Sequence, residues 1–354
     1  MLATAHRPGH PLPDEIVIDP DLPIIDAHHH LWKKPDSVYL VPDLLEDLGA
    51  GHRVEATVYV EGGSMHASDE LAGCMYRRSG PRELKTLGET EFANGAAAMG
   101  ESGLFGPTRF CAGIVGNIDF ALGARVADVL DEHCKMPRFK GARILGLWHD
   151  DPRIRNAALL TRPHMLMDSL IREGIAALRE RDLSFEVLVF HSQFEELLDL
   201  ARAMPGQRIA ITHMGGIIGT GPYEGRRDEY RKEWLAHMRT LAGCGNVYLK
   251  IGGLVAPRGG FGFHTRPTPP DYLELADAFR PFVEPAIELF GPRRCMFESN
   301  FPVDRAVVGY RTLWDAYKSI AAQYTSAERL RLFYGTANEF YRLGMPDVTP
   351  QPQQ

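Results

Sequence analysis

The chain has 354 residues, of which 44% are hydrophobic and 24% are charged, and its formal net charge is −7 at pH 7. This composition is that of a globular enzyme whose hydrophobic core is large enough to stabilise the fold without disulfide bonds or structural metal ions. Because the balance is acidic and the basic residues are dispersed, the sequence argues against nucleic acid as a partner.

The cysteines and the N-terminus indicate the compartment. There are five cysteines, an odd number without a CxxC pair, which is typical of reduced thiols. The N-terminal MLATAHRPGHPLPDE has no apolar segment of the signal-peptide type, and no later stretch approaches a membrane span. We therefore expect a cytoplasmic protein that acts on a small molecule and has no membrane partner.

The domain organisation is expected to be simple. Residues 1–20 are proline-rich and should form an arm over the domain, residues 21–346 should form one domain, and residues 347–354 should be a frayed tail. The segment 64–109 is too long for an ordinary connection, so we expect it to carry a helix and a lid or a subunit contact, with a mobile linker as the alternative. We expect a homodimer.

Eight short apolar runs recur along the chain. They cover residues 22–30, 55–63, 110–118, 139–147, 183–191, 207–215, 246–253 and 294–302. Nearly continuous apolar runs are typical of parallel strands that are covered on both faces. Helical patterns lie between many of them, most clearly at 120–134, 165–182, 194–205, 230–244 and 273–291.

This alternation of strands and helices predicts an α/β fold, and eight such units favour a (β/α)8 barrel of the TIM type. A doubly wound sheet would give the same alternation. However, a dinucleotide-binding fold would place a GxGxxG turn after the first strand, where this chain has HxH.

The first strand, in the stretch IIDAHHHLW at 24–32, ends in an unusual density of titratable groups. In a regular strand Asp26, His28 and His30 share one side, while Ala27 and His29 face the other. Two imidazoles two residues apart can grip a divalent metal or a substrate anion. A histidine-rich turn bonded to backbone and water is the structural alternative.

Other strand ends carry polar residues as well. The active site of a TIM barrel is built at the C-terminal ends of its strands. Four of the eight predicted strands end in, or run straight into, histidine, which favours a functional cluster over isolated structural histidines. The polar residues at these ends are His28, His30, Glu61, Trp148, His149, His191, Thr212, His213, Lys250, Glu298, Asn300 and Asp304.

The motifs DAHHHLW, FH at 190–191, THMGG, ESNFPVD and the closing YGTANEFYRL resemble the amidohydrolase superfamily, in its lactonase and carboxylyase branch. The opening motif is most similar to the sugar lactonases of the L-fuconolactonase group, and 2-pyrone-4,6-dicarboxylate lactonase is a second neighbour. The resemblance covers almost the whole chain and implies an amidohydrolase-like barrel. It also implies that His28, His30 and His191 are metal ligands, with zinc the expected ion, and that His213 is catalytic or polarises the substrate.

The eighth strand departs from this pattern. Metal-dependent members of the superfamily end that strand in an aspartate, and here Asn300 stands in its place. A neutral amide cannot act as a general base. Asp304 is our first candidate for that role and Glu298 the competing one. Each has a structural alternative, because Glu298 could pair with an arginine and Asp304 could cap the helix expected near residue 309. Losing one anionic ligand also weakens the case for a tightly held metal.

These residues predict a hydrolase that opens a sugar-derived or aromatic-pathway lactone with activated water. No serine nucleophile elbow is visible, which argues against an acyl-enzyme. Asn300, Trp148, His149, Arg258 and His264 are the expected substrate-binding residues, and solvated loop charges and simple packing are their alternatives. A metal-dependent decarboxylase of an aromatic or related acid is the second enzyme hypothesis, and a non-enzymatic binding barrel is the third.

Overall fold

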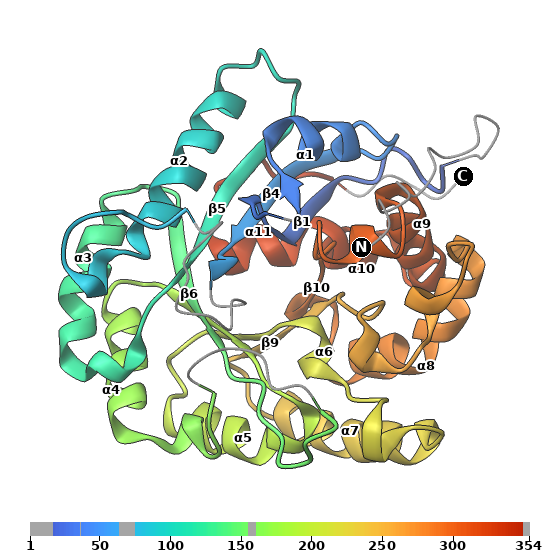
Figure 1. Ribbon diagram of the computed structural model, residues 1–354. Coiled ribbons are helices and arrows are strands. Elements are labelled where there is room, and N and C mark those ends of the chain that lie inside the picture. Colours follow the sequence, from blue (N-terminus) through green and yellow to red (C-terminus); the bar gives the residue numbers. More distant parts are fainter. Residues whose placement is uncertain (1–16, 36, 64–74, 155–160, 350–354) are drawn as a thin grey trace.

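The structure is a computed structural model that describes residues 17–35, 37–63, 75–154 and 161–349. Its centre is a sheet of eight parallel strands (Figure 1). Each strand is hydrogen-bonded to the sheet strand that comes next in the sequence. They are β1 (Ile24–His29), β4 (Val54–Val60), β5 (Arg109–Asn117), β6 (Phe139–Leu145), β7 (Ser184–Leu188), β8 (Ile209–Ile211), β9 (Val247–Ile251) and β10 (Cys295–Phe297). Each lies within or overlaps one of the eight predicted runs, so the strand prediction is confirmed.

The two edge strands of this sheet meet through the residues that follow β10. The backbone N–H of Asn300 donates to the carbonyl of His28 at 2.9 Å, and the N–H of His30 donates to the carbonyl of Phe301 at 2.7 Å. These bonds join the end of β1 to the chain after β10 and bring the sheet round into a barrel. The ends of the first and last strands therefore lie side by side.

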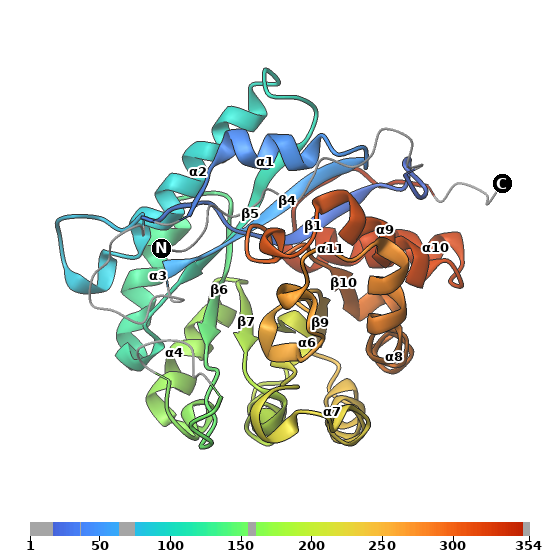
Figure 2. The same cartoon turned by 45° about the vertical axis from the view of Figure 1, so that its right-hand side comes forward.

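Helices surround the strands in both views (Figure 1, Figure 2). They are α1 (Val41–Leu48), α2 (Leu87–Glu101), α3 (Val126–Cys134), α4 (Ser169–Glu180), α5 (Phe194–Ala203), α7 (Arg227–Ala242), α8 (Tyr272–Phe290) and α9 (Tyr310–Ala321). Shorter elements complete the described chain: the β2 (Trp32–Lys33) and β3 (Val38–Tyr39) pair, α6 (His213–Gly216), α10 (Ser326–Leu330) and α11 (Thr336–Tyr341). The predicted (β/α)8 barrel is confirmed.

Local sequence explains where these helices begin and end. Asp271 precedes α8 and accepts a hydrogen bond from the N–H of Glu274 at 2.9 Å, which satisfies a backbone donor that the first turn would leave free. Asp168 caps α4 in the same way through the N–H of Leu170. Gly291 ends α8 with φ of 75°, a conformation that glycine adopts without steric cost.

One end of the barrel is closed by the C-terminal segment. Phe340 and Tyr341 of α11 belong to an apolar cluster with Ile25, Val58 and Met296 on the strands. The hydroxyl of Ser184, the first residue of β7, donates to the carbonyl of Phe340 at 3.4 Å. Because α11 packs at the N-terminal ends of the strands, the C-terminal ends form the other end of the barrel.

The long segment 64–109 carries a helix, as the sequence predicts. Its helix α2 packs along β5 and returns the chain from β4, as an outer helix of the barrel does. The helix expected in this segment is therefore present, and the lid or subunit contact stays a prediction. Residues 64–74 lie outside the described part of the chain.

The described part of the N-terminal arm lies against α9. The N–H of Ile18 donates to Asp315 at 2.8 Å, and the Lys318 ammonium donates to the carbonyl of Asp19 at 2.6 Å. Residues 1–16 and 350–354 fall outside the described ranges. Among the helices that the structure describes, none is long and apolar enough to cross a membrane.

Candidate active site

The histidines of the first strand converge as the HxH pattern predicts. The Nε2 atoms of His28 and His30 lie 3.2 Å apart, and both side chains are fully buried. The Nδ1 atom of His30 lies 2.8 Å from the carbonyl oxygen of Val60, so this nitrogen is the ring's donor and Nε2 its acceptor. His29 faces the other way, where its Nε2 lies 2.8 Å from the hydroxyl of Thr57.

Asp26 does not share the side of the two histidines, which corrects the expectation from simple alternation. It accepts hydrogen bonds from the N–H of Ser299 at 2.9 Å and from the hydroxyl of Tyr310, on the outer helix α9, at 3.0 Å. The pairing of β1 with β4 shifts register between Asp26 and His29. This irregularity interrupts the two-residue period and turns Asp26 away from His28.

A strained turn presents His213 to the end of the eighth strand. His213 and Met214 have φ of 54° and 57°, in the left-handed region that residues other than glycine seldom adopt. Glu298, just after β10, accepts hydrogen bonds from the backbone N–H of His213 at 2.9 Å and from its ring Nδ1 at 2.6 Å. The ring of His213 lies next to His28, with 4.6 Å between the centroids. Strain of this kind is characteristic of functional sites.

A buried chain of charges supports Glu298 from within the barrel. The Lys250 ammonium lies 3.4 Å from Glu298 Oε2, 3.2 Å from His28 Nδ1 and 2.9 Å from Glu186 Oε2. Tyr341, from the segment that closes the other end, donates its hydroxyl to Glu186. All of these side chains are buried, so the charges are balanced inside the barrel rather than by solvent.

A second buried ion pair lies beside the histidines. Arg143 on β6 donates to Glu61 Oε1 through Nε at 2.8 Å and to the carbonyl of Glu61 at 2.6 Å. Its Nη1 lies 3.4 Å from His28 Nε2. Arg143 therefore brings a positive charge to the edge of the HxH pair.

Burial and these charges set the protonation states. Burial lowers the pKa of His28 and of His30 well below the usual value, and the nearby cations Lys250 and Arg143 lower them further. Burial also lowers the pKa of His213, against the opposing effect of Glu298. For Glu298, burial alone would raise the pKa, but His213, Lys250 and His28 together hold it well below its usual range. The histidines are neutral and Glu298 is ionised at neutral pH.

Asp304 behaves unlike Glu298. Its Oδ1 accepts a hydrogen bond from the Asn300 amide at 2.7 Å, and its Oδ2 is buried without a hydrogen-bond partner. Burial raises the pKa of Asp304 to about 8, although Asn300 and Arg258 oppose that shift. Asp304 is therefore mainly protonated at neutral pH and is a proton donor there.

His191 lies beyond the end of its strand. β7 ends at Leu188, three residues earlier, and His191 begins a 3-10 turn. Its Nδ1 accepts from the N–H of Ile218 at 3.3 Å, its ring lies 5.1 Å from that of Tyr223, and its Nε2 is buried without a partner. In the described chain, the one group of three potential metal ligands is His28, His213 and Glu298, and His191 is not part of it.

The remaining expected substrate residues divide into two groups. His149 and Tyr223 line a cavity of about 470 Å³ at the mouth of the barrel. His149 Nε2 lies 3.4 Å from the Tyr223 hydroxyl. Trp148, which precedes His149 in the chain, is half-buried. His264 is exposed in a 3-10 turn, and no hydrogen bond or ion pair among the described residues joins it to the histidine cluster. The substrate-binding role of His264 stays a prediction.

A metal ion can be tested against this donor set. His30 Nδ1 is engaged by Val60, and His28 Nδ1 lies 3.0 Å from Glu298 Oε2, so both Nε2 atoms can offer lone pairs to one ion. Metal-bound histidines usually have the second ring nitrogen hydrogen-bonded in this way. The Arg143 guanidinium is ion-paired with Glu61 at 2.7 Å, which weakens its repulsion of a nearby cation, so the residues fit a divalent metal on this pair of histidines.

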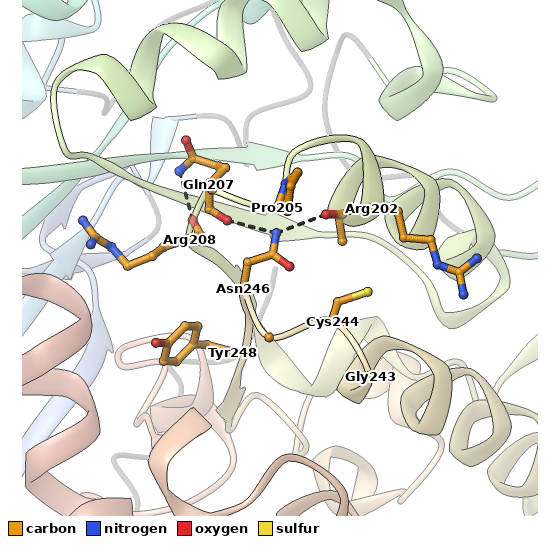
Figure 3. A pocket seen from close by; sticks show the side chains of 11 residues that line it. Arg202, Pro205, Gln207, Arg208, Gly243, Cys244, Asn246 and Tyr248 are labelled. Carbon is orange, nitrogen blue, oxygen red and sulfur yellow. Dashed lines mark hydrogen bonds between the residues drawn. The ribbon is translucent and has the colours of Figure 1, made fainter.

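Another cavity, of about 520 Å³, lies at the opposite end of the barrel (Figure 3). Asn246 is at its centre and donates to the carbonyls of Ala201, Met204 and Gln207 at 2.9 to 3.2 Å. The amide thus satisfies the C-terminal carbonyls of α5 and of the turn before β8. This is a structural role at the N-terminal ends of the strands, away from the chemistry.

Sequence reasoning missed Arg143, Glu186 and Tyr341. Arg143 and Glu186 lie in the middle of strands, whereas the search considered strand ends. Their signal was a single charged residue inside an otherwise apolar strand, which is costly unless the charge is paired. Tyr341 carried no such signal, because only the fold brings it to Glu186.

Comparisons with known proteins find relatives over almost the whole chain. A family described as amidohydrolase matches residues 25–343. An uncharacterized protein of Sinorhizobium fredii, y4mH, is 32% identical over 91% of this chain and 99% of its own length. An L-fucono-1,5-lactonase of Burkholderia ambifaria is 26% identical over 91% of this chain and 96% of its own.

Solved structures share the fold. An amidohydrolase of Burkholderia multivorans, crystallised with bound zinc, has a TM-score of 0.67 at 22% identity and covers 90% of this chain and 99% of its own. A putative 2-pyrone-4,6-dicarboxylic acid hydrolase of Pseudomonas putida has a TM-score of 0.63 at 17% identity and covers 92% of this chain and 99% of its own.

Proposed function

The chain belongs to the amidohydrolase family, and we propose that it hydrolyses a lactone, of sugar or aromatic-pathway origin, with His213 as the general base. The observation that carries this proposal is the double hydrogen bond from His213 to Glu298. Because His213 Nδ1–H donates a hydrogen bond to the ionised Glu298 carboxylate, the proton of the neutral ring stays on Nδ1. The lone pair of Nε2 is then free to accept a proton from a water molecule. The names of the lactonases among its relatives support this choice of substrate.

The proposed reaction uses the charges around His213. His213 Nε2 takes a proton from water as its oxygen adds to the lactone carbonyl. Arg143 lies beside His28, next to His213, where its guanidinium would stabilise the developing oxyanion. Glu298 is a positioning residue, because it holds the tautomer of His213 and stabilises its protonated form.

Asp304 would complete the ring opening. When the ring C–O bond breaks, the leaving alkoxide needs a proton, and Asp304 Oδ2 carries one at neutral pH. This assignment reverses the role expected from the sequence, where Asp304 was the first candidate for the base. The unpartnered oxygen and the raised pKa support the donor role.

We propose zinc as the metal, held by His28 and His30. When bound, zinc would act as a Lewis acid on the carbonyl oxygen. The facing Nε2 atoms and the zinc-bound relative from Burkholderia multivorans support this choice.

Titration of released acid tests the proposal. The purified protein is offered five- and six-membered lactones of sugar acids and a pyrone carboxylate, and base uptake and evolved CO₂ are measured together. We expect base uptake without CO₂. Evolution of CO₂ from the pyrone carboxylate would instead favour the decarboxylase, and no reaction with any lactone would contradict the proposal.

A further inference from the structure

Arg258 is a cation without a hydrogen-bonded partner at the mouth of the barrel. Within the described ranges, no hydrogen bond or ion pair of its side chain is found, whereas Arg266 on the same loop pairs with Glu274 at 3.0 Å. Arg258 is half-buried, so solvent only partly compensates its guanidinium. An incompletely solvated donor without a partner costs free energy until a ligand satisfies it.

The guanidinium lies within electrostatic reach of His213, Asp304 and Glu298. Burial lowers the pKa of Arg258, and Asp304 and Glu298 are the carboxyls whose charges oppose that shift. Neither carboxyl is available as a partner. Asp304 accepts a hydrogen bond from the Asn300 amide and is mainly protonated at neutral pH. Glu298 accepts a hydrogen bond from the His213 ring and lies next to the Lys250 ammonium.

The backbone around Arg258 is fixed in advance. Its carbonyl accepts from the N–H of Gly219 at 2.7 Å, and the hydroxyl of Tyr230 lies 3.4 Å from the carbonyl of Gly259. Gly260 has φ of 71°, and a Cβ there would lie 2.3 Å from the carbonyl oxygen of Gly219, so only glycine allows the two loops to approach this closely. A preorganised cation loses less entropy when it binds.

We propose that Arg258 binds an ionised carboxylate that the substrate carries in addition to its lactone group, so that the preferred substrate is an anionic lactone. The inference rests on the proposed lactonase function and specifies its substrate class. A guanidinium matches a carboxylate through two parallel hydrogen bonds, which a neutral hydroxymethyl group cannot make. A site built around such a partner discriminates strongly against analogues that lack it.

A matched pair of lactones tests the proposal. One is a neutral aldonic acid lactone, and the other has the same ring with its terminal hydroxymethyl group oxidised to a carboxylate. The wild-type protein should hydrolyse the carboxylated lactone with a kcat/KM at least about 10²-fold higher. Arg258→Gln should bring that ratio towards one, mainly by raising KM for the carboxylated lactone. Arg258→Lys should keep part of the ratio, and the control Arg266→Gln should keep all of it.

Two results would overturn the inference: equal kcat/KM values for the two lactones in the wild-type protein, or an unchanged ratio in folded Arg258→Gln. If neither lactone is hydrolysed, the lactonase proposal fails, and calorimetry then tests Arg258 separately. The probes are the open-chain dicarboxylic acid and the matching neutral polyol. Binding of the diacid that is lost in Arg258→Gln supports the carboxylate site, and binding that is unchanged in Arg258→Gln, or no binding to the wild type, refutes it.

Discussion

Glu298 accepts two hydrogen bonds from one residue, His213, through the backbone N–H at 2.9 Å and the ring Nδ1 at 2.6 Å. The carboxylate thereby fixes the position and the tautomer of the imidazole, and it favours the protonated form of the ring. Asn300 occupies the place where the superfamily usually has its aspartate and cannot accept a proton. We therefore propose His213, at the end of β8, as the general base, with Glu298 as the anion that supports it.

The first prediction concerns Glu298→Gln. The amide can still accept the Nδ1 proton but no longer stabilises protonated His213, so kcat should fall by roughly 10² to 10⁴. Loss of the anion also lowers the pKa of His213, and the acid limb of kcat/KM against pH should move to lower pH. The control is Glu195→Gln, an exposed acid in the first turn of α5. Wild-type turnover in Glu298→Gln would contradict the role of Glu298.

For Asp304 we predict the opposite pH dependence, with turnover lost at high pH. Because the protonated form is the donor and its pKa is about 8, wild-type turnover should fall as the pH rises through that value. Asp304→Asn should lower turnover by roughly 10² to 10⁴ and remove this alkaline limb. Turnover that increases up to pH 10 in the wild-type protein would argue for Asp304 as a base instead.

Lys250→Met tests the buried charge network. The substitution leaves Glu186 and Glu298 without their shared cation in the barrel interior, and breaking a buried pair in this way typically costs about 3 to 5 kcal/mol. Chemical denaturation should show a loss of this size in the free energy of unfolding. The double variant Lys250→Met/Glu186→Gln should recover part of it. If the double variant is as unstable as the two single losses added together, the two residues are not coupled.

Zinc content separates the ligand set expected from the sequence, which includes His191, from the pair of histidines that we propose. Atomic absorption on the dialysed protein should find zinc in the wild type, and chelation followed by dialysis should remove it. His28→Asn and His30→Asn should abolish zinc binding, because each removes one of the facing Nε2 atoms. His191→Asn should retain it, since His191 is neither one of the two facing histidines nor a member of the group of His28, His213 and Glu298. Loss of zinc in His191→Asn alone would restore the ligand set expected from the sequence.

The barrel could be predicted because its signals are local. The eight strands are continuous apolar runs, and the HxH pattern, His213 and Asp304 stand at or just beyond strand ends where a barrel places its site. The pairing of His28 with His30 followed from the two-residue period of a strand. The orientation of Asp26 did not, because the register shift in β1 depends on its pairing with β4.

The electrostatics of the site could not be predicted in the same way. The protonation of Asp304 depends on burial and on Arg258, which is 46 residues away in the chain. Lys250 donates a hydrogen bond to Glu186, and Glu186 also accepts one from the Tyr341 hydroxyl. Only the closed barrel brings these residues into contact. His191 was assigned from the end of a predicted strand, and the true strand ends three residues earlier.

The most direct test of the account is the rate of lactone hydrolysis, followed by base uptake at constant pH, in the wild-type protein and in His213→Asn. The wild type should release one equivalent of acid per lactone opened, and His213→Asn should be slower by roughly 10² to 10⁴ while remaining folded. His237→Asn on the outer helix α7 is the matched control and should keep the wild-type rate. A His213→Asn variant that opens lactones as fast as the wild type would contradict the central claim.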